Sequence, residues 1–174
     1  MCAYYNVSPL YATAEEGHLE VVDLLLENEA NVNEEADNKK TPLHIASEKG
    51  HYQIVKRLLD AGALIDASDD NGVTPLLAAV KNKKESVIRL LVEYNADPNK
   101  LDKEGNFPLK ASVSQPEICE LLLNNKANPN LVNDKNECAL LCASEIGNMD
   151  TVTLLLERNA DPNKNHLLKD LHYL

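Results

Sequence analysis

Residues 41–73 read TPLHIASEKGHYQIVKRLLDAGALIDASDDNGV, and this stretch decides the fold. Thr41 can cap a helix through its hydroxyl, and Pro42 suits the first helical position because an N–H there would have no partner inside the helix. Small residues follow on one narrow face, which lets a neighbouring helix approach closely. Gly50 then stops the helix, so the stretch begins with one short helix of about two turns.

A second amphipathic helix and a turn complete the stretch. Its apolar side chains recur at helical spacing between polar ones, at Ile54, Val55, Leu58 and Leu59. Gly62 follows where a left-handed residue closes a helix, and Asn71-Gly72 predicts a tight hairpin-type turn. Two short antiparallel helices and a turn cannot bury their apolar faces alone, so each copy of the unit needs a neighbour stacked on it.

Copies of this unit recur along the whole chain at a nearly constant interval. Their starts lie 33, 33, 33 and 31 residues apart, at Ser8, Thr41, Thr74, Phe107 and Cys138. A second set of markers closes the copies at matching intervals, at Asn33, Asp66, Asn99, Asn130 and Asn163. The leucine run of the fourth copy places its two missing residues in the turn between its helices, near residues 114–116.

Two local features of the copies need special backbone conformations. In the third copy, Lys83-Lys84 replace the Gly50-His51 pair, and we expect Asn82 to make the turn between the helices because asparagine tolerates the left-handed region. The second helices should close on a left-handed residue, which glycine and asparagine suit best. The residues at that position are Glu29, Gly62, Asn95, Lys126 and Asn159.

These motifs resemble the ankyrin repeat, whose period is about 33 residues. The residues that carry the resemblance are TPLHIA at 41–46, Gly50-His51, Leu58-Leu59 and Asp69 with Gly72, and the likeness spans residues 6–163. It implies an all-α solenoid of stacked antiparallel helix pairs with projecting β-hairpin loops. We predict a single ankyrin-repeat domain over residues 1–174, with repeats at 8–40, 41–73, 74–106, 107–137 and 138–165.

The two ends of the chain fall outside this frame. Residues 1–7 are too few for a hairpin and are predicted to form a minimal N-terminal cap over the first repeat. Residues 166–174 are predicted to be either a C-terminal cap or a truncated sixth repeat, since LKDLH echoes the start of the unit. As a cap they would cover the fifth repeat with Leu167, Leu168, Leu171 and Leu174.

Charge and cysteine usage limit the partners and the compartment. The formal net charge is −11 and the isoelectric point is about 4.8, which argues against nucleic acid or an anionic membrane as a partner and favours a protein with a basic surface. Four cysteines at irregular positions do not indicate a disulfide framework, and the sequence shows neither a signal peptide nor a membrane span. We expect an intracellular monomer, cytoplasmic or nuclear.

Neither a catalytic, a cofactor nor a metal site is predicted. The histidines His18, His44 and His51 fall on frame positions, where the resemblance implies hydrogen bonds within and between turns rather than acid–base chemistry. Cys138 and Cys142 lie four residues apart on a helix, but no matched second pair of ligands follows. Their alignment predicts a helix start at the first and a core residue at the second, while Cys119 is predicted to be core.

The resemblance implies partner binding through a concave side made of hairpin tips and first-helix faces. The positions there vary between copies, and the alternative is that they drift because nothing constrains them. Glu15 and Glu16 add to the first-helix surface, and exposed Val73 and Ile146 are the expected apolar anchors. The predicted contact set is Asp37, Asn38, Lys40, Glu48, Lys49, Asp70, Asn71, Val73, Lys81, Asn82, Lys103, Glu104, Asn106, Asp134, Lys135, Glu137 and Ile146.

Two other functions stay open at this point. Four asparagines each follow a leucine by eight residues, which resembles the pattern of asparaginyl hydroxylase substrates, although frame positions explain the same spacing. These possible hydroxylation sites are Asn33, Asn99, Asn130 and Asn163. The chain is alternatively the recognition part of a larger enzyme, channel or effector.

Overall fold

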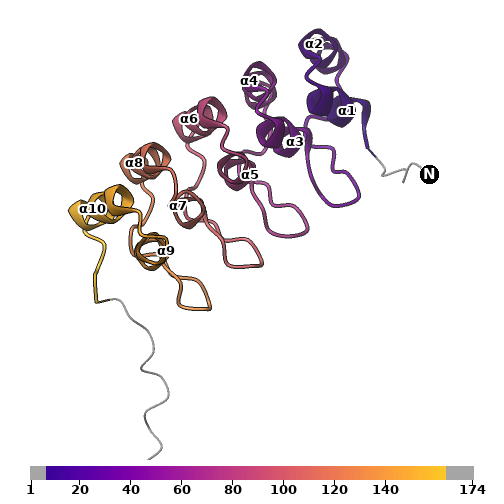
Figure 1. Ribbon diagram of the computed structural model, residues 1–174. Coiled ribbons are helices and arrows are strands. Elements are labelled where there is room, and N and C mark those ends of the chain that lie inside the picture. Colours follow the sequence, from indigo (N-terminus) through magenta and orange to yellow (C-terminus); the bar gives the residue numbers. More distant parts are fainter. Residues whose placement is uncertain (1–6, 164–174) are drawn as a thin grey trace, which may run out of the picture.

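The computed structural model describes residues 7–163, which fold into ten helices arranged as five antiparallel pairs (Figure 1). The pairs stand side by side in one elongated array. The first helices form one row: α1 (Pro9–Glu16), α3 (Pro42–Lys49), α5 (Pro75–Lys81), α7 (Pro108–Ala111) and α9 (Ala139–Glu145). The second helices form the other: α2 (Leu19–Glu27), α4 (Tyr52–Asp60), α6 (Glu85–Glu93), α8 (Pro116–Asn124) and α10 (Met149–Glu157). The predicted all-α solenoid is confirmed.

The first helices begin as their sequences predict. Ser8 and Thr74 accept the backbone N–H three residues on with their hydroxyls, at 3.1 and 3.2 Å, and Cys138 does so with its thiol sulfur at 3.4 Å. Proline follows the cap in α1, α3, α5 and α7. These caps satisfy backbone donors that a helix cannot pair internally, so they fix where α1, α5 and α9 start.

The core lies in the seams between neighbouring helix pairs. Leu58 of α4 and Leu91 of α6 are completely buried, as the repeat requires. Small side chains on the first helices, among them Ala46 and Ala79, are also completely buried, and α3 packs directly against α1 and α5. Burying a leucine stabilises the fold by roughly 1.5 to 3 kcal/mol, so neighbouring pairs hold each other in place.

The loops between pairs project from the first-helix row, away from the second helices (Figure 1). Each is a tight turn closed by a backbone bond, as between the Asp69 N–H and the Val73 carbonyl at 3.0 Å. Gly72 alone takes the left-handed conformation there, with φ of 77°. Within residues 7–163 none of these loops forms a β-strand, so the hairpins are five-residue turns.

Two frame histidines make hydrogen bonds to the backbone, His44 within its own unit and His51 to the preceding one, as predicted. His44 accepts the Thr41 N–H at Nδ1 (3.1 Å) and donates from Nε2 to the Val73 carbonyl (3.1 Å), while His51 donates to the Glu15 carbonyl (3.0 Å). Burial holds the pKa of His44 below its usual value, which favours this neutral ring.

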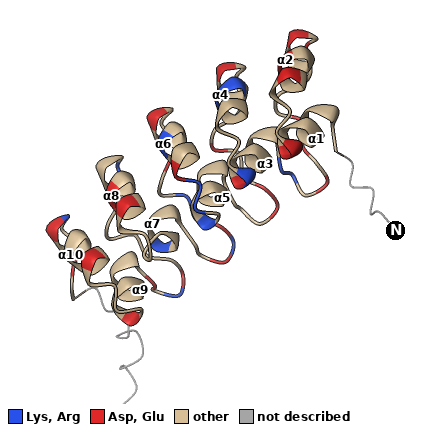
Figure 2. Cartoon of the chain, turned by 45° about the horizontal axis from the view of Figure 1, so that its top comes forward, with Lys and Arg blue, Asp and Glu red and all other residues tan. Residues whose placement is uncertain are grey.

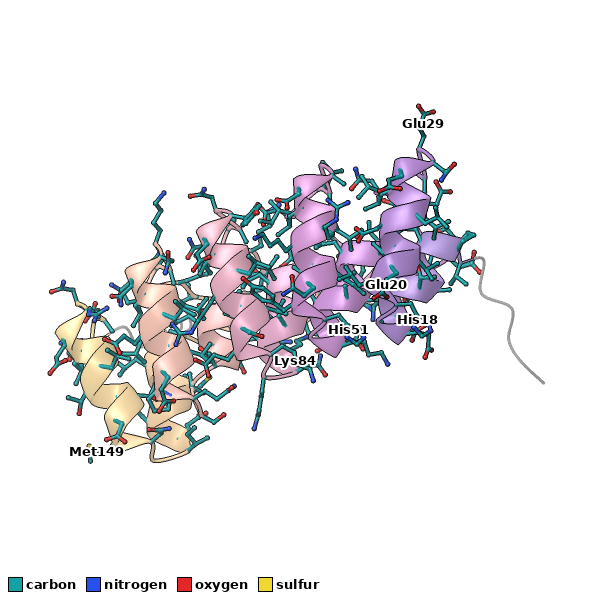
Figure 3. The ribbon with its side chains drawn as sticks, turned by 90° about the horizontal axis from the view of Figure 1, so that it is seen from above. His18, Glu20, Glu29, His51, Lys84 and Met149 are labelled. Atoms are coloured by element: carbon teal, nitrogen blue, oxygen red, sulfur yellow. The ribbon has the colours of Figure 1, made fainter. Side chains whose placement is uncertain are left out.

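His18 repeats the position of His51 at the first pair of helices. In Figure 3 His18, His51 and Lys84 follow one another along one edge of the array, at the turns between helices, and Glu29 lies at the opposite edge. Among the described residues nothing hydrogen-bonds the His18 ring. The equivalent bond of His51 runs to the preceding helix pair, and no described helix pair precedes α1 and α2. Of the three histidines predicted to form hydrogen bonds within or between turns, His44 and His51 do so in the described part of the chain.

Two turns between helices differ from expectation. Asn82 was the expected left-handed residue in the third unit, and this is wrong: its φ is −99°, and Lys83 takes the left-handed place with φ of 56°. The Asn82 side chain donates to the Ala78 carbonyl at 2.9 Å, which keeps it at the end of α5. In the fourth unit the two missing residues were expected in the turn near residues 114–116, and this is wrong: α7 has only four residues, whereas the turn at residues 112–115 before α8 is not shortened.

The predicted caps at the chain ends, residues 1–7 and 166–174, lie outside the described residues except for Val7. Among the helices that are described, none has the length and apolar character needed to cross a membrane.

All five second helices close on a left-handed residue, which confirms the predicted register. The φ angles are 60° at Glu29, 86° at Gly62, 65° at Asn95, 70° at Lys126 and 63° at Asn159. Residues other than glycine and asparagine are strained in this conformation, so the backbone is strained at Glu29 and Lys126.

Replacing Lys126 by glycine should therefore raise the free energy of unfolding by about 0.4 to 1 kcal/mol, because the strain outweighs the added flexibility of the unfolded chain. Urea denaturation measures this as a higher midpoint at an unchanged slope. Asn125→Gly is the control, since φ there is −114°, and its midpoint should fall. A Lys126→Gly midpoint equal to that of the wild type contradicts the strain at this position.

Candidate binding groove

The hairpin loops and the first helices together make one continuous side of the array (Figure 1). We call this surface the hairpin face: the loops at residues 36–40, 69–73, 102–106 and 133–137, with α1, α3, α5, α7 and α9 and the residue that directly follows each of these helices. Its residues come from every unit, so its geometry depends on how firmly each loop is held and how the loops are spaced.

A buried polar side chain at the base holds each of the last three loops. The Oδ1 of Asp69 accepts the N–H groups of Asn71 and Val73 at 2.8 and 2.9 Å. Asp102 and Asn133 do the same for the residues two and four positions further on. Sequence reasoning noted Asp69 as a motif residue but missed this anchoring role, although the same side-chain chemistry recurs at three of the four loop bases.

Neighbouring loops are also bonded to one another. The Asp70 N–H donates to the Asn38 carbonyl at 3.0 Å, and the Lys103 N–H donates to the Asn71 carbonyl at 2.8 Å. The Asn133 side chain donates to the Gly105 carbonyl at 2.9 Å. The tips therefore have fixed spacing, and their side chains project from a braced backbone.

The residues predicted to contact a partner all lie on the hairpin face, at varying depth. Ile146 at the end of α9 has 56 % of its surface exposed, whereas Val73 is half-buried. Half-buried as well are Lys40, Glu48, Asn106 and Glu137. Exposed are Asp37, Asn38, Lys49, Asp70, Asn71, Lys81, Asn82, Lys103, Glu104, Asp134 and Lys135.

Several of these predicted residues have partners within the chain. Lys40 pairs with Glu48 at 2.7 Å, and Lys49 approaches Glu15 at 3.7 Å. Two further pairs join a first helix to the next loop: Lys81 to Asp102 at 2.7 Å, and Lys110 to Glu137. Part of the variation between copies thus supplies braces, which the sequence analysis had not foreseen.

The Lys81–Asp102 pair is the most buried of these braces, with only 2 % of the Asp102 side chain exposed. Burial alone would raise the pKa of Asp102, but hydrogen bonds from Lys81 and Asn106 outweigh it and hold that pKa below its ordinary value. The carboxylate is therefore charged at neutral pH and serves the loop and the brace at once.

Three of the four candidate hydroxylation sites join one unit to the next by hydrogen bonds. The side-chain oxygens of Asn33, Asn99 and Asn130 each accept a backbone N–H of the next unit at 2.8 Å, from Leu64, Asn128 and Asp161 respectively. Asn163, the last described residue, is exposed. Hydroxylation at these positions stays a prediction.

The cysteines show no arrangement for nucleophilic chemistry among the described residues. Cys119 is buried as predicted, and Cys138 starts α9 as predicted, whereas Cys142 is half-buried rather than core. Burial raises the pKa of the Cys119 and Cys142 thiols, which disfavours the reactive thiolates.

Stacked helix pairs with loops held at fixed spacing are the structure of a repeat protein with one extended surface. The chain belongs to the ankyrin-repeat family: residues 3–69 and 76–166 match the family described as "Ankyrin repeats (3 copies)". No match was found among curated proteins. Ankyrin repeats are general protein–protein interaction modules, and the family is typically non-catalytic.

Removing the loop anchor at Asp102 should cost about 1 to 3 kcal/mol of unfolding free energy in the Asp102→Ala variant, because two loop N–H groups and Lys81 lose their acceptor. Asp102→Asn should cost less, since Asn133 shows that an amide can hold a loop. Urea denaturation gives both values. Asp134→Ala is the exposed control and should stay within about 0.5 kcal/mol, and an equal loss in all three variants contradicts the anchoring role.

Proposed function

We propose that this chain is a non-catalytic scaffold that holds a partner protein on its hairpin face. The observation that carries the proposal is the bracing of the loops: buried anchors and loop-to-loop hydrogen bonds fix the tips before any partner arrives. A surface ordered in advance loses little conformational entropy on binding, so more of the contact energy becomes affinity.

Specific contacts come from the side chains that the braces leave available. Asp70, Lys103, Asp134 and Lys135 project from three successive tips, and among the described residues their side chains have neither an ion pair nor a hydrogen bond. Ile146 supplies an exposed apolar contact at the far end of the face. A row of charged tips with an apolar anchor favours an extended partner segment that crosses several units.

The partner in this proposal carries a basic surface. Acidic residues outnumber basic ones by 28 to 17, and α2, α4, α6 and α10 each end on an acidic residue (Figure 2). This charge would repel nucleic acid and anionic membranes. We further propose an intracellular monomer whose five helix pairs are five repeats of one domain, acting alone or as the recognition part of a larger protein.

A pull-down from cell extract tests the face. In Val73→Glu plus Ile146→Glu, two apolar positions of the hairpin face become charged, and we expect recovery of bound partners to fall at least about tenfold, the effect of losing roughly 1.4 kcal/mol. The matched control is Val21→Glu plus Leu24→Glu, which makes the same change at exposed positions of α2. Equal recovery of every partner by wild type and the first variant would exclude the hairpin face.

A further inference from the structure

Within residues 7–163, the hairpin face lacks at its first loop the ion pair that braces the third loop. Lys81 on α5 pairs with Asp102, the base of a loop 21 residues further on. At the same spacing, Glu15 on α1 stands opposite Ala36, the base of the first loop. A carboxylate and a methyl group cannot form that ion pair, so this corner is left without it.

A hollow of about 270 Å³ lies at this corner. Its lining combines apolar and acidic side chains, with Lys40 and Asn38 at the rim. The main lining residues are Val7, Tyr11, Glu15, Ala36, Ile45 and Glu48. The alanine matters because Asp69, Asp102 and Asn133 place a larger side chain at the equivalent loop bases.

Tyr11 contributes an unused polar group to the hollow. Only 7 % of this residue is exposed, yet its hydroxyl has no hydrogen bond among the described residues. Burial and the nearby carboxylates of Glu15 and Glu48 raise the pKa of Tyr11 to about 12. Tyr11, Glu15 and Glu48 thus line one hollow together with the apolar side chain of Ile45.

The carboxylates are already neutralised in part by one half-buried and one exposed lysine. The Lys40–Glu48 side chains are 24 % and 31 % exposed, and the Lys49–Glu15 side chains are 45 % and 40 % exposed at a separation of 3.7 Å. An exposed pair such as Lys49–Glu15 contributes little, so an incoming cation can displace it, while the half-buried Glu48 is shared between Lys40 and that cation.

We propose that this hollow receives an arginine side chain of the partner protein, a step that rests on the proposed function. The aliphatic stem would lie against Ile45 and the Tyr11 ring, and the guanidinium would donate to Glu15 and Glu48. Arginine fits better than lysine because its planar group has five donors for several acceptors and stacks on an aromatic ring. The first loop thereby selects one basic residue within the partner segment.

Titration of the full chain with the peptide acetyl-Gly-Arg-Gly-amide tests this, followed by ¹H–¹⁵N NMR. We expect saturable shifts at the amides of Tyr11, Ala36 and Ile45. The citrulline peptide, which keeps the shape of arginine without its charge, should bind at least about tenfold more weakly, because charge-assisted hydrogen bonds are about twice as strong as neutral ones. Equal binding of the two peptides, or shifts confined to other loops, overturns the proposal.

Ala36→Asn is the decisive variant, since it fills the hollow with a neutral side chain that the loop before α9 already accommodates at Asn133. Arginine-peptide binding should be lost in Ala36→Asn and weakened at least about fivefold in Glu48→Gln, whose carboxylate is removed. Glu20→Gln makes the same charge change at an exposed position of α2, away from the hairpin face, and should bind as wild type does. Unchanged binding by Ala36→Asn overturns the proposal.

Tyr11→Phe provides a second variant if Ala36→Asn alters the circular dichroism spectrum. It keeps the ring and removes the hydroxyl, and we expect binding about threefold weaker. The proposed function is judged separately: a wild-type chain that captures its partner on the hairpin face but does not bind the arginine peptide disproves only the arginine site.

Discussion

The structure depends on apolar burial between neighbouring helix pairs. A single pair leaves one side of each helix exposed, and only a second pair against it removes leucines such as Leu58 and Leu91 from water. Because this stabilisation arises between units, the units must be nearly identical where they touch and are free to differ where they do not. Ankyrin-repeat chains combine a constant frame with a variable surface for this reason.

Polar contacts then convert a stack of helices into a defined surface. Each loop carries backbone groups that the helices cannot satisfy, and the anchors Asp69, Asp102 and Asn133 pair them at every loop base but the first. Asn33, Asn99 and Asn130 fix one unit to the next on the other side of the loops. The first loop has Ala36 instead of an anchor, and the hollow beside it follows from that one missing side chain.

Most of the fold was predictable from the sequence, because helix starts, stops and seams are local features of the repeat. The left-handed residues at Lys126 and Glu29 were predicted from alignment alone. Local preference failed at Asn82, where a side-chain bond to the Ala78 carbonyl holds the asparagine at the end of α5 with a negative φ, and Lys83 takes the left-handed conformation instead. The predicted contact residues lie on the expected loops and helices, but their ion pairs join residues from 8 positions apart, in Lys40–Glu48, to 34 positions apart, in Lys49–Glu15, and the sequence alone does not reveal such pairs.

Native-state hydrogen exchange tests the dependence on neighbouring pairs most directly. The account predicts that amides in α4, α6 and α8, which have a described helix pair on both sides, open with the highest free energy, and that protection declines toward α2 and α10. Equal protection in all five second helices, with a single global opening, would contradict a stack stabilised by its neighbours.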